Sequence, residues 1–117
     1  MKRRTVVLLS MLGLTWATSS PAQEYRRFEG QYRVGSKTIS DPPPGEAKDR
    51  VYLLLTGKSA KDIYDAMPGK AVKDPCGENL RSKNAGGFQC VKDGGGEVSC
   101  SVAITLNRGE TAPGSVC

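Results

Sequence analysis

The apolar positions of this chain gather around one stretch, from Val51 to Met67. It opens with the run VYLLL at 51–55, which is long enough for a strand and too short for a buried helix. Beyond Thr56-Gly57, four apolar residues recur at the i, i+3, i+4, i+7 spacing of one helical face: Ala60, Ile63, Tyr64 and Met67. The pattern predicts a strand over 51–55, a tight glycine turn, and a helix over 59–67 that packs back onto a sheet.

Polar residues give this helix its expected ends. Ser59 and Asp62 have the spacing of a capping box, with Asp in place of the usual Glu, so each side chain would bond the main-chain N–H of the other residue. Pro68-Gly69 then stops the helix, because proline restricts the residue before it and has no N–H to donate.

Two further strands are predicted over 88–92 and 97–106, joined by the glycine-rich loop at 93–96. If the hairpin is centred on Gly94, residue 90 faces 98 and residue 88 faces 100, and directly opposed side chains share a face. That register places all the large apolar side chains on one side of the sheet, where the helix can dock: Phe88, Cys90, Val98, Cys100, Val102, Ile104 and Leu106. The glycines supply the positive φ that such loops need.

The segment 68–85 is dense in Lys, Asp, Gly, Asn and Pro, and we expect a loop there. A turn at 107–110 is followed by a tail that is expected to add a short final strand ending at Cys117. The fold class predicted is therefore α+β, a small antiparallel sheet with one helix packed on one face.

The N-terminus has the three parts of a secretory signal peptide. Residues 2–4 are basic, residues 6–17 are apolar with few interruptions, and Ser20-Pro21-Ala22 puts small residues before a cleavage point at Gln23. The apolar part is shorter than the roughly 18 residues that a membrane-spanning helix needs. We therefore expect residues 1–22 to be removed, leaving a periplasmic or secreted protein with no membrane span.

Removal of the signal changes the charge balance. The whole chain has a net charge of +5, but three of its 17 basic residues lie in the signal, which leaves 14 against 12 acidic residues, or +2. Nucleic-acid binders usually carry a much stronger basic surplus on one face. No nucleic-acid partner is expected.

Four cysteines lie in the expected mature protein: Cys76, Cys90, Cys100 and Cys117. An even number in a small exported chain predicts two disulfides. The alternative is a zinc site made of four thiolates, but the chain has no histidine and no C-x-x-C pair. Of the three possible pairings, we expect Cys76–Cys90 and Cys100–Cys117, because Cys90 and Cys100 would be diagonal neighbours in the hairpin register above.

The segment 23–47 is a polar N-terminal arm that ends in a proline-rich spacer, Pro42 to Gly45, expected to be stiff and extended. It precedes the compact disulfide-bonded domain, 48–117. The arm interleaves aromatic residues with arginines, which are residue types enriched where proteins bind one another. The candidate partner-binding residues are Tyr25, Arg26, Arg27, Phe28, Tyr32 and Arg33. The alternative is an edge strand or a loosely docked arm whose arginines only solvate it.

Catalytic residues are hard to find in this sequence. Without histidine the commonest general base is missing, and oxidised cysteines are not nucleophiles. Asp62 and Asp65 lie three residues apart on the expected helix and are the one candidate carboxylate pair. A structural role as cap and solvated surface residue explains them as well.

These observations predict an exported, non-catalytic binding protein of the cell envelope with no cofactor and no metal. An inhibitor or immunity-type partner of another protein is the form of binding protein that we expect. The alternatives are a small carboxylate-dependent hydrolase that acts on envelope material, and a structural envelope protein. The rigid loops at 70–87 and 93–96 suit protein recognition at low entropic cost.

Overall fold

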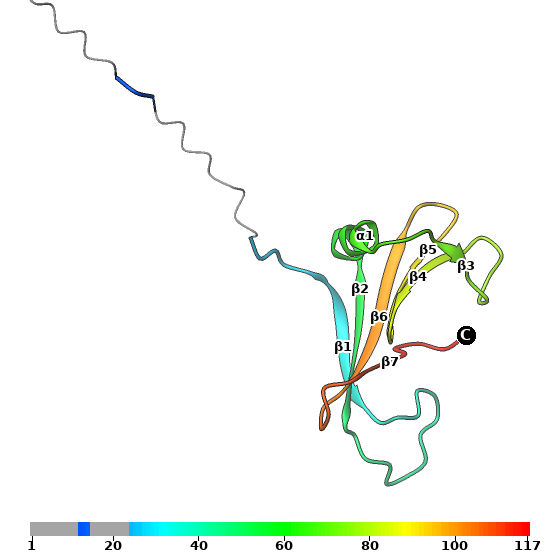
Figure 1. The fold of residues 1–117 in the computed structure, drawn as a ribbon. Helices are drawn as coiled ribbons and strands as arrows, with labels where there is room; N and C mark the ends of the chain where they lie inside the picture. Colours follow the sequence, from blue (N-terminus) through cyan, green and yellow to red (C-terminus); the bar gives the residue numbers. More distant parts are fainter. Residues whose placement is uncertain (1–11, 15–23) are drawn as a thin grey trace, which may run out of the picture.

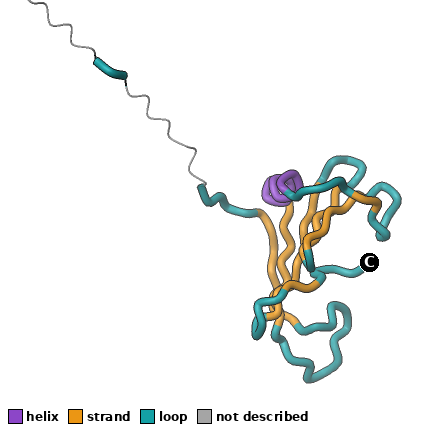
Figure 2. The backbone as a smooth tube through the Cα atoms, in the orientation of Figure 1, coloured by secondary structure: helices purple, strands orange, loops and turns teal. Residues whose placement is uncertain are grey.

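Seven strands and one helix follow one another along the residues that the computed structural model describes, 12–14 and 24–117. The strands form one antiparallel sheet with the helix across one end of it, so the predicted α+β class is confirmed (Figures 1 and 2). The elements in chain order are β1 (Glu29–Gly35), β2 (Arg50–Thr56), α1 (Gly57–Ala66), β3 (Val72–Lys73), β4 (Arg81–Ala85), β5 (Phe88–Lys92), β6 (Val98–Thr105) and β7 (Thr111–Ala112).

The sheet is organised around β6, its most buried strand. Its strand order is β1-β2-β6-β5-β4-β3. β2 pairs with β6 along one edge, while β5 and then β7 share the other edge. Neighbouring side chains of a strand point to opposite faces of the sheet. We call the face that α1 covers at one end the helix face. The C-terminal residues 113–117 run over the second face, which we call the tail face.

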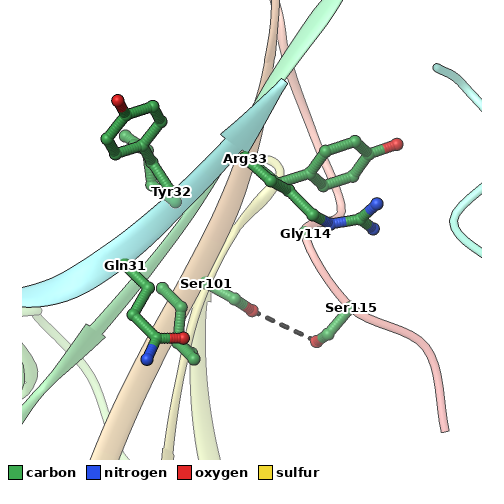
Figure 3. Close-up of a pocket in the computed structure, with 9 residues that line it drawn as sticks. Gln31, Tyr32, Arg33, Ser101, Gly114 and Ser115 are labelled. Atoms are coloured by element: carbon green, nitrogen blue, oxygen red, sulfur yellow. Dashed lines mark hydrogen bonds between the residues drawn. The ribbon is translucent and has the colours of Figure 1, made fainter. Parts of the chain in front are cut away.

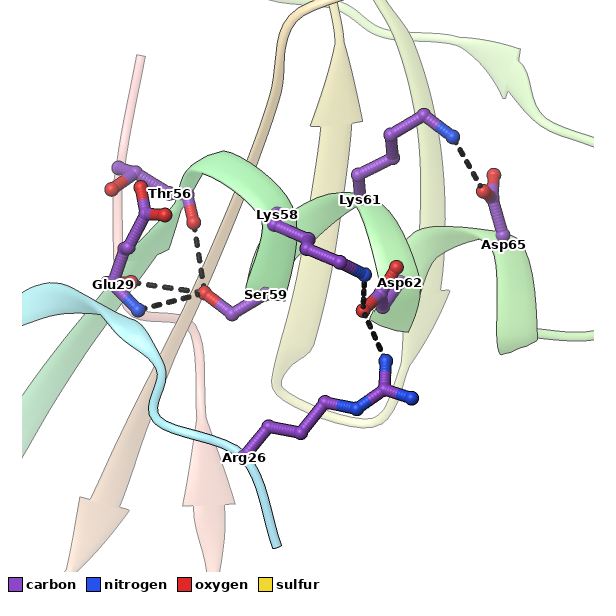
Figure 4. Close-up of polar contacts among 8 residues, drawn as sticks. All are labelled: Arg26, Glu29, Thr56, Lys58, Ser59, Lys61, Asp62 and Asp65. Carbon is purple, nitrogen blue, oxygen red and sulfur yellow. Dashed lines mark hydrogen bonds and ion pairs between the residues drawn. The ribbon is translucent and has the colours of Figure 1, made fainter. Parts of the chain in front are cut away.

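The apolar face of the helix is confirmed. Ala60 and Tyr64 are buried in the main core cluster, and Ile63 and Met67 pack against it. The capping box is wrong, because α1 begins two residues before Ser59, where Gly57 turns the chain out of β2 with φ +59°. Ser59 therefore lies inside the first turn, and its hydroxyl bonds back to Thr56 O (2.8 Å) instead of capping the helix (Figure 4).

The register of the β5–β6 hairpin is shifted by two residues from the predicted one, so that residue 90 faces 100 and not 98. Asp93 was counted as loop, but its N–H donates to Glu97 O (2.9 Å), which leaves a three-residue glycine loop with Gly96 at φ +86°. Cys90 therefore lies directly opposite Cys100, with the Cα atoms 4.0 Å apart. The two cysteines form a disulfide, so the expected Cys76–Cys90 bridge is wrong.

The shift keeps the predicted common face, because it moves the register by an even number of residues. Phe88, Cys90, Val98 and Cys100 all contact or belong to the core beneath α1. Leu106 does not, since β6 ends at Thr105 and the side chain of Leu106 is exposed in the turn that follows.

Two strands lie in the segment that was expected to be a loop. β4 has the sequence RSKNA, which shows no apolar alternation, yet it pairs with β5 over its whole length. Lys83 explains part of this, because its Nζ donates to the carbonyls of Tyr64 (3.1 Å) and Met67 (3.2 Å) and so satisfies the C-terminal end of α1. β3 pairs with β4 through two residues only.

The second disulfide joins Cys76 to Cys117, which corrects the expected Cys100–Cys117 bridge. The predicted final strand exists as β7, but it ends at Ala112 and the tail continues without pairing to Cys117. At Gly114 the tail lies so close to β6 that a Cβ atom there would be 2.5 Å from Val102 N. The tail is thus fastened at both ends, to the sheet through β7 and to the loop between β3 and β4 through Cys76.

β1 is the edge strand that was one alternative for the N-terminal arm, and it pairs with β2 along seven residues. A loop of 14 residues, 36–49, connects the two strands and hangs below the sheet in Figure 1. The proline-rich spacer is not extended, because Glu46 N donates to Pro43 O (3.2 Å) and closes a turn. Glu46 also ties the loop together, since its carboxylate accepts hydrogen bonds from Thr38 N (2.7 Å) and Thr38 Oγ1 (2.9 Å).

Acid is expected to loosen this loop through Glu46. The hydrogen bond from the Thr38 N–H holds the pKa of the Glu46 carboxyl below its usual range. The stabilisation is therefore fully present above the usual carboxyl pKa of about 4.3 and is lost as the pH falls through the lower folded-state value.

Between pH 7 and 3 the thermal midpoint of Glu46→Gln should fall less than that of the wild type. Glu78→Gln is the control and should follow the wild type, because none of the hydrogen bonds or ion pairs of the described residues uses the Glu78 carboxylate. Equal acid sensitivity of wild type and Glu46→Gln would contradict the assignment.

The expected signal peptide, 1–22, lies outside the described residues apart from 12–14. Within the part that is described, no helix has the length and apolar character needed to cross a membrane.

Candidate binding groove

A groove of about 340 Å³ lies on the tail face, between the strands β1 and β2 on one side and the C-terminal tail on the other. Figure 3 shows its residues. They come from four parts of the chain, namely β1, β2, β6 and the tail: Gln31, Tyr32, Arg33, Tyr52, Leu53, Leu54, Ser101, Gly114 and Ser115. Its volume is at the lower end of the range for small-ligand sites, which suits a short segment or one anchoring side chain.

The floor of the groove is made by alternate residues of the two central strands. Leu54 of β2 lies opposite Ser101 of β6, and Tyr52 lies opposite Ala103. Tyr52 is buried and its hydroxyl donates a hydrogen bond to Ser36 O, whereas Leu54 is 41% exposed. Leu54 therefore presents an apolar surface that the protein itself leaves open to solvent.

The tail forms the opposite wall. Ser115 Oγ lies 3.1 Å from Ser101 Oγ, within hydrogen-bonding distance (Figure 3). Gly114 allows the close approach to β6, because a side chain at this position would collide with the main chain of Val102. The Cys76–Cys117 disulfide then fixes the far end of the tail. The wall is consequently held in place before any ligand arrives.

Among the described residues, Arg33 is the one charged residue that lines the groove. Its guanidinium lies 4.3 Å from the centre of the Tyr52 ring, a cation–π contact, and one Nη donates to Ile39 O (3.3 Å). A guanidinium has five N–H donors, so most of them stay available to a carboxylate. The groove thus offers a positive charge beside an apolar floor.

The structure separates the six predicted partner-binding residues into two groups. Tyr32 and Arg33 belong to β1 and line the groove, with side chains that point to opposite sides of the strand (Figure 3). Tyr25, Arg26, Arg27 and Phe28 lie in the segment before β1 and are exposed. Arg26 approaches Asp62 of α1 at 3.6 Å (Figure 4). Tyr32 and Arg33 therefore lie at the groove, and the four residues before β1 do not.

Asp62 and Asp65 do not form a carboxylate pair. Each makes an i,i+4 ion pair, Asp62 with Lys58 at 2.7 Å and Asp65 with Lys61 at 3.1 Å, on the solvent side of α1 (Figure 4). The hydrogen bond from Lys58 lowers the pKa of Asp62. A general acid that acts near neutral pH needs a raised pKa instead. The geometry suits a helix surface.

Asp74 lies beside Cys76 and Cys117, which together have the spacing of three metal ligands. The two sulfur atoms are joined in a disulfide and carry no thiolate charge, so they are poor ligands. Asp74 is buried and already satisfied, since its carboxylate accepts hydrogen bonds from Cys76 N (2.8 Å) and Gln89 Nε2 (3.2 Å). Its role is to shape the loop that carries Cys76.

Comparison with known proteins adds no identity to this geometry. No family model matches the chain, and neither does any curated protein or solved structure. The function must therefore be argued from the groove and from the edges of the sheet.

Most of the groove lining was missed by sequence reasoning, including Gln31, Leu54, Ser101 and Ser115. One signal was available. An uninterrupted apolar run such as 51–55 is typical of a strand that is covered on both faces, and the predicted helix covers only one of them. Tyr52 and Leu54 therefore need cover on the second face, and the tail supplies part of it.

Proposed function

We propose that this chain is an exported, non-catalytic binding protein that holds an extended segment of another envelope protein in the groove on its tail face. The observation that carries the proposal is the partly exposed Leu54 floor, framed by Arg33 and by a tail that the disulfide fixes. An inhibitor or an immunity-type partner is the form of binding protein that this arrangement suits.

The chemistry of the lining defines the segment. Leu54 and the ring of Tyr52 favour an apolar side chain, and Arg33 favours a carboxylate close to it. The hydroxyls of Ser101 and Ser115 can exchange their mutual hydrogen bond for bonds to a ligand main chain. A wall that is already fixed lowers the entropic cost of binding. We expect an acidic residue next to an apolar one in the bound segment.

The site fits an oxidising compartment, because its wall depends on a disulfide. We place the mature protein in the periplasm or outside the cell. The rival function is a small hydrolase that uses Asp62 or Asp65, and the third is a structural envelope protein. The ion pairs of both aspartates argue against the hydrolase.

The test is a capture experiment with a groove-filled variant. The tagged mature protein is used to recover its partner from an envelope extract, and Ser115→Tyr places a ring in the groove. We expect the wild type to retain one stoichiometric partner whose activity it inhibits, and the variant to bind it at least about tenfold more weakly. Leu106→Lys is the control, because Leu106 is exposed outside the groove.

Two results would overturn the proposal. Equal binding of the partner by the wild type and Ser115→Tyr would show that the partner does not bind in the groove. Turnover of a cell-wall or ester substrate that Asp62→Asn abolishes would establish the hydrolase.

A further inference from the structure

The two edges of the sheet differ in a way that calls for an explanation. One edge is β3, which is only two residues long. The other is β1, which has seven residues, six of them exposed, and to which no segment among residues 12–14 and 24–117 pairs on the outer side (Figure 1). Long exposed edge strands are templates for pairing with another chain, and proteins usually shorten or block them. β1 contains no proline and no lysine.

The groups that β1 presents outward follow from its contacts. In an antiparallel pair, the N–H and C=O of one residue point to the same side, and successive residues alternate. The N–H of Glu29 donates to Ser59 Oγ (3.0 Å), and Glu29 O lies 3.1 Å from the same oxygen, so Glu29 points toward the β2 side (Figure 4). Gly30, Tyr32 and Val34 therefore direct their main-chain groups to the free edge.

We propose that two copies of this chain pair through β1, antiparallel, about a two-fold axis at Gln31. This inference goes beyond the proposed function and does not depend on it. The pairing joins two seven-stranded sheets into one and satisfies the outward main-chain groups of both edges. Each groove stays on the tail face of its own sheet, next to the new seam, because Gln31, Tyr32 and Arg33 of β1 line it.

The register about Gln31 is selected by the side chains. Glu29 of one copy lies opposite Arg33 of the other, twice, and Gln31 lies opposite itself. On the helix face, Phe28 faces Val34 of the second copy, and Tyr32 covers Gly30. Pairs of opposite charge and pairs of aromatic or apolar side chains are favourable across two strands. An aromatic ring opposite a glycine also stabilises a sheet, because the ring covers the main chain that the glycine leaves bare.

The two neighbouring registers lack this complementarity. An axis at Gly30 would place Arg27 opposite Arg33 of the second copy, two like charges that repel. An axis at Tyr32 would place Glu29 opposite Gly35 and leave Arg33 facing Gln31, so both charge pairs are lost. Moving the axis by one residue shifts the pairing by two residues. Shifts by an odd number are not possible, because they would set outward main-chain groups of one copy against inward ones of the other.

The test is the self-association of the oxidised mature chain, measured by sedimentation equilibrium. We expect a dimer in the wild type. Glu29→Arg and Arg33→Glu should each raise the dimer dissociation constant at least about tenfold, because each opposes two pairs of like charges. A mixture of the two variants should associate again, since every Arg then faces a Glu. This rescue is specific to the axis at Gln31.

The controls separate the edge from general charge effects. Arg108→Glu changes the same charge at an exposed ion pair in the β6–β7 turn and should leave the dissociation constant unchanged. Val34→Pro keeps all charges but removes an outward N–H and should also weaken the dimer. A wild type that stays monomeric at millimolar concentration, or a mixture that fails to associate although both variants melt like the wild type, would overturn the proposal.

Discussion

Tyr64→Asp is expected to destabilise the domain by at least about 4 kcal/mol. Tyr64 is buried in the core cluster between α1 and the β5–β6 hairpin. The substitution removes a large aromatic side chain from the core and replaces it with a carboxylate that loses its hydration there. It also removes the ring over which Lys83 (4.5 Å) and Lys92 (5.6 Å) lie. Chemical denaturation of the oxidised protein, followed by circular dichroism, measures the loss.

Tyr64→Phe is the matched control. It keeps the ring and its volume, and no hydrogen bond of the Tyr64 hydroxyl is present among the described residues. We therefore expect its free energy of unfolding to stay within about 1 kcal/mol of the wild type. If Tyr64→Asp melts like the wild type, the apolar face of α1 is not the core of this protein.

The double variant Cys76→Ser with Cys117→Ser is expected to lose about 4 kcal/mol of stability, because the bridge spans 41 residues and restricts the unfolded chain strongly. The same change frees the tail that forms one wall of the groove. Binding of a partner in the groove should therefore fall together with stability. Denaturant unfolding gives the first effect, and the capture experiment gives the second.

Hydrogen exchange distinguishes the two effects. Amides of the short strand β7, from which the tail continues, should exchange faster in the double variant, while amides of the central strand β6 remain protected under conditions where the variant is folded. Ser115→Thr is the control, since it changes the tail but keeps the bridge and the hydroxyl. Unchanged stability and unchanged exchange of the β7 amides would show that the bridge does not hold the groove wall.

The parts of the fold that could be predicted are those with strong local periodicity. The spacing of Ala60, Ile63, Tyr64 and Met67 identified the buried face of α1 because a helix repeats every 3.6 residues. The limits of β5 were also predicted correctly, at Phe88 and Lys92. Both are properties of a few consecutive residues, which the sequence records directly.

Errors arose where structure depends on distant partners. β4 was missed because RSKNA has no apolar pattern, and its strand conformation comes from pairing with β5 and from the bonds of Lys83 to α1. The disulfides were mispaired because counting Asp93 as loop moved the hairpin axis by one residue. That small error turned the directly opposed Cys90 and Cys100 into diagonal neighbours.

The groove could not be predicted for a related reason. Its floor comes from β2 and β6, its edge from β1, and its wall from a tail that reaches across the sheet to Cys76. No short window of sequence contains these contacts. Tyr32 and Arg33 were found only because their residue types are common at interfaces. The long-range bridge holds the tail, and with it Ser115, at the groove that these two residues help to line.

The Cys90–Cys100 bridge also bears on the order in which the protein folds. It joins the two strands of one hairpin, only ten residues apart in sequence. In an oxidised but unfolded chain, β5 and β6 therefore remain neighbours in nearly native alignment, and their loop need not be closed again. The hairpin can then act as a nucleus on which β2 and α1 assemble, and the slow search that sheets of distant strands usually require is shortened.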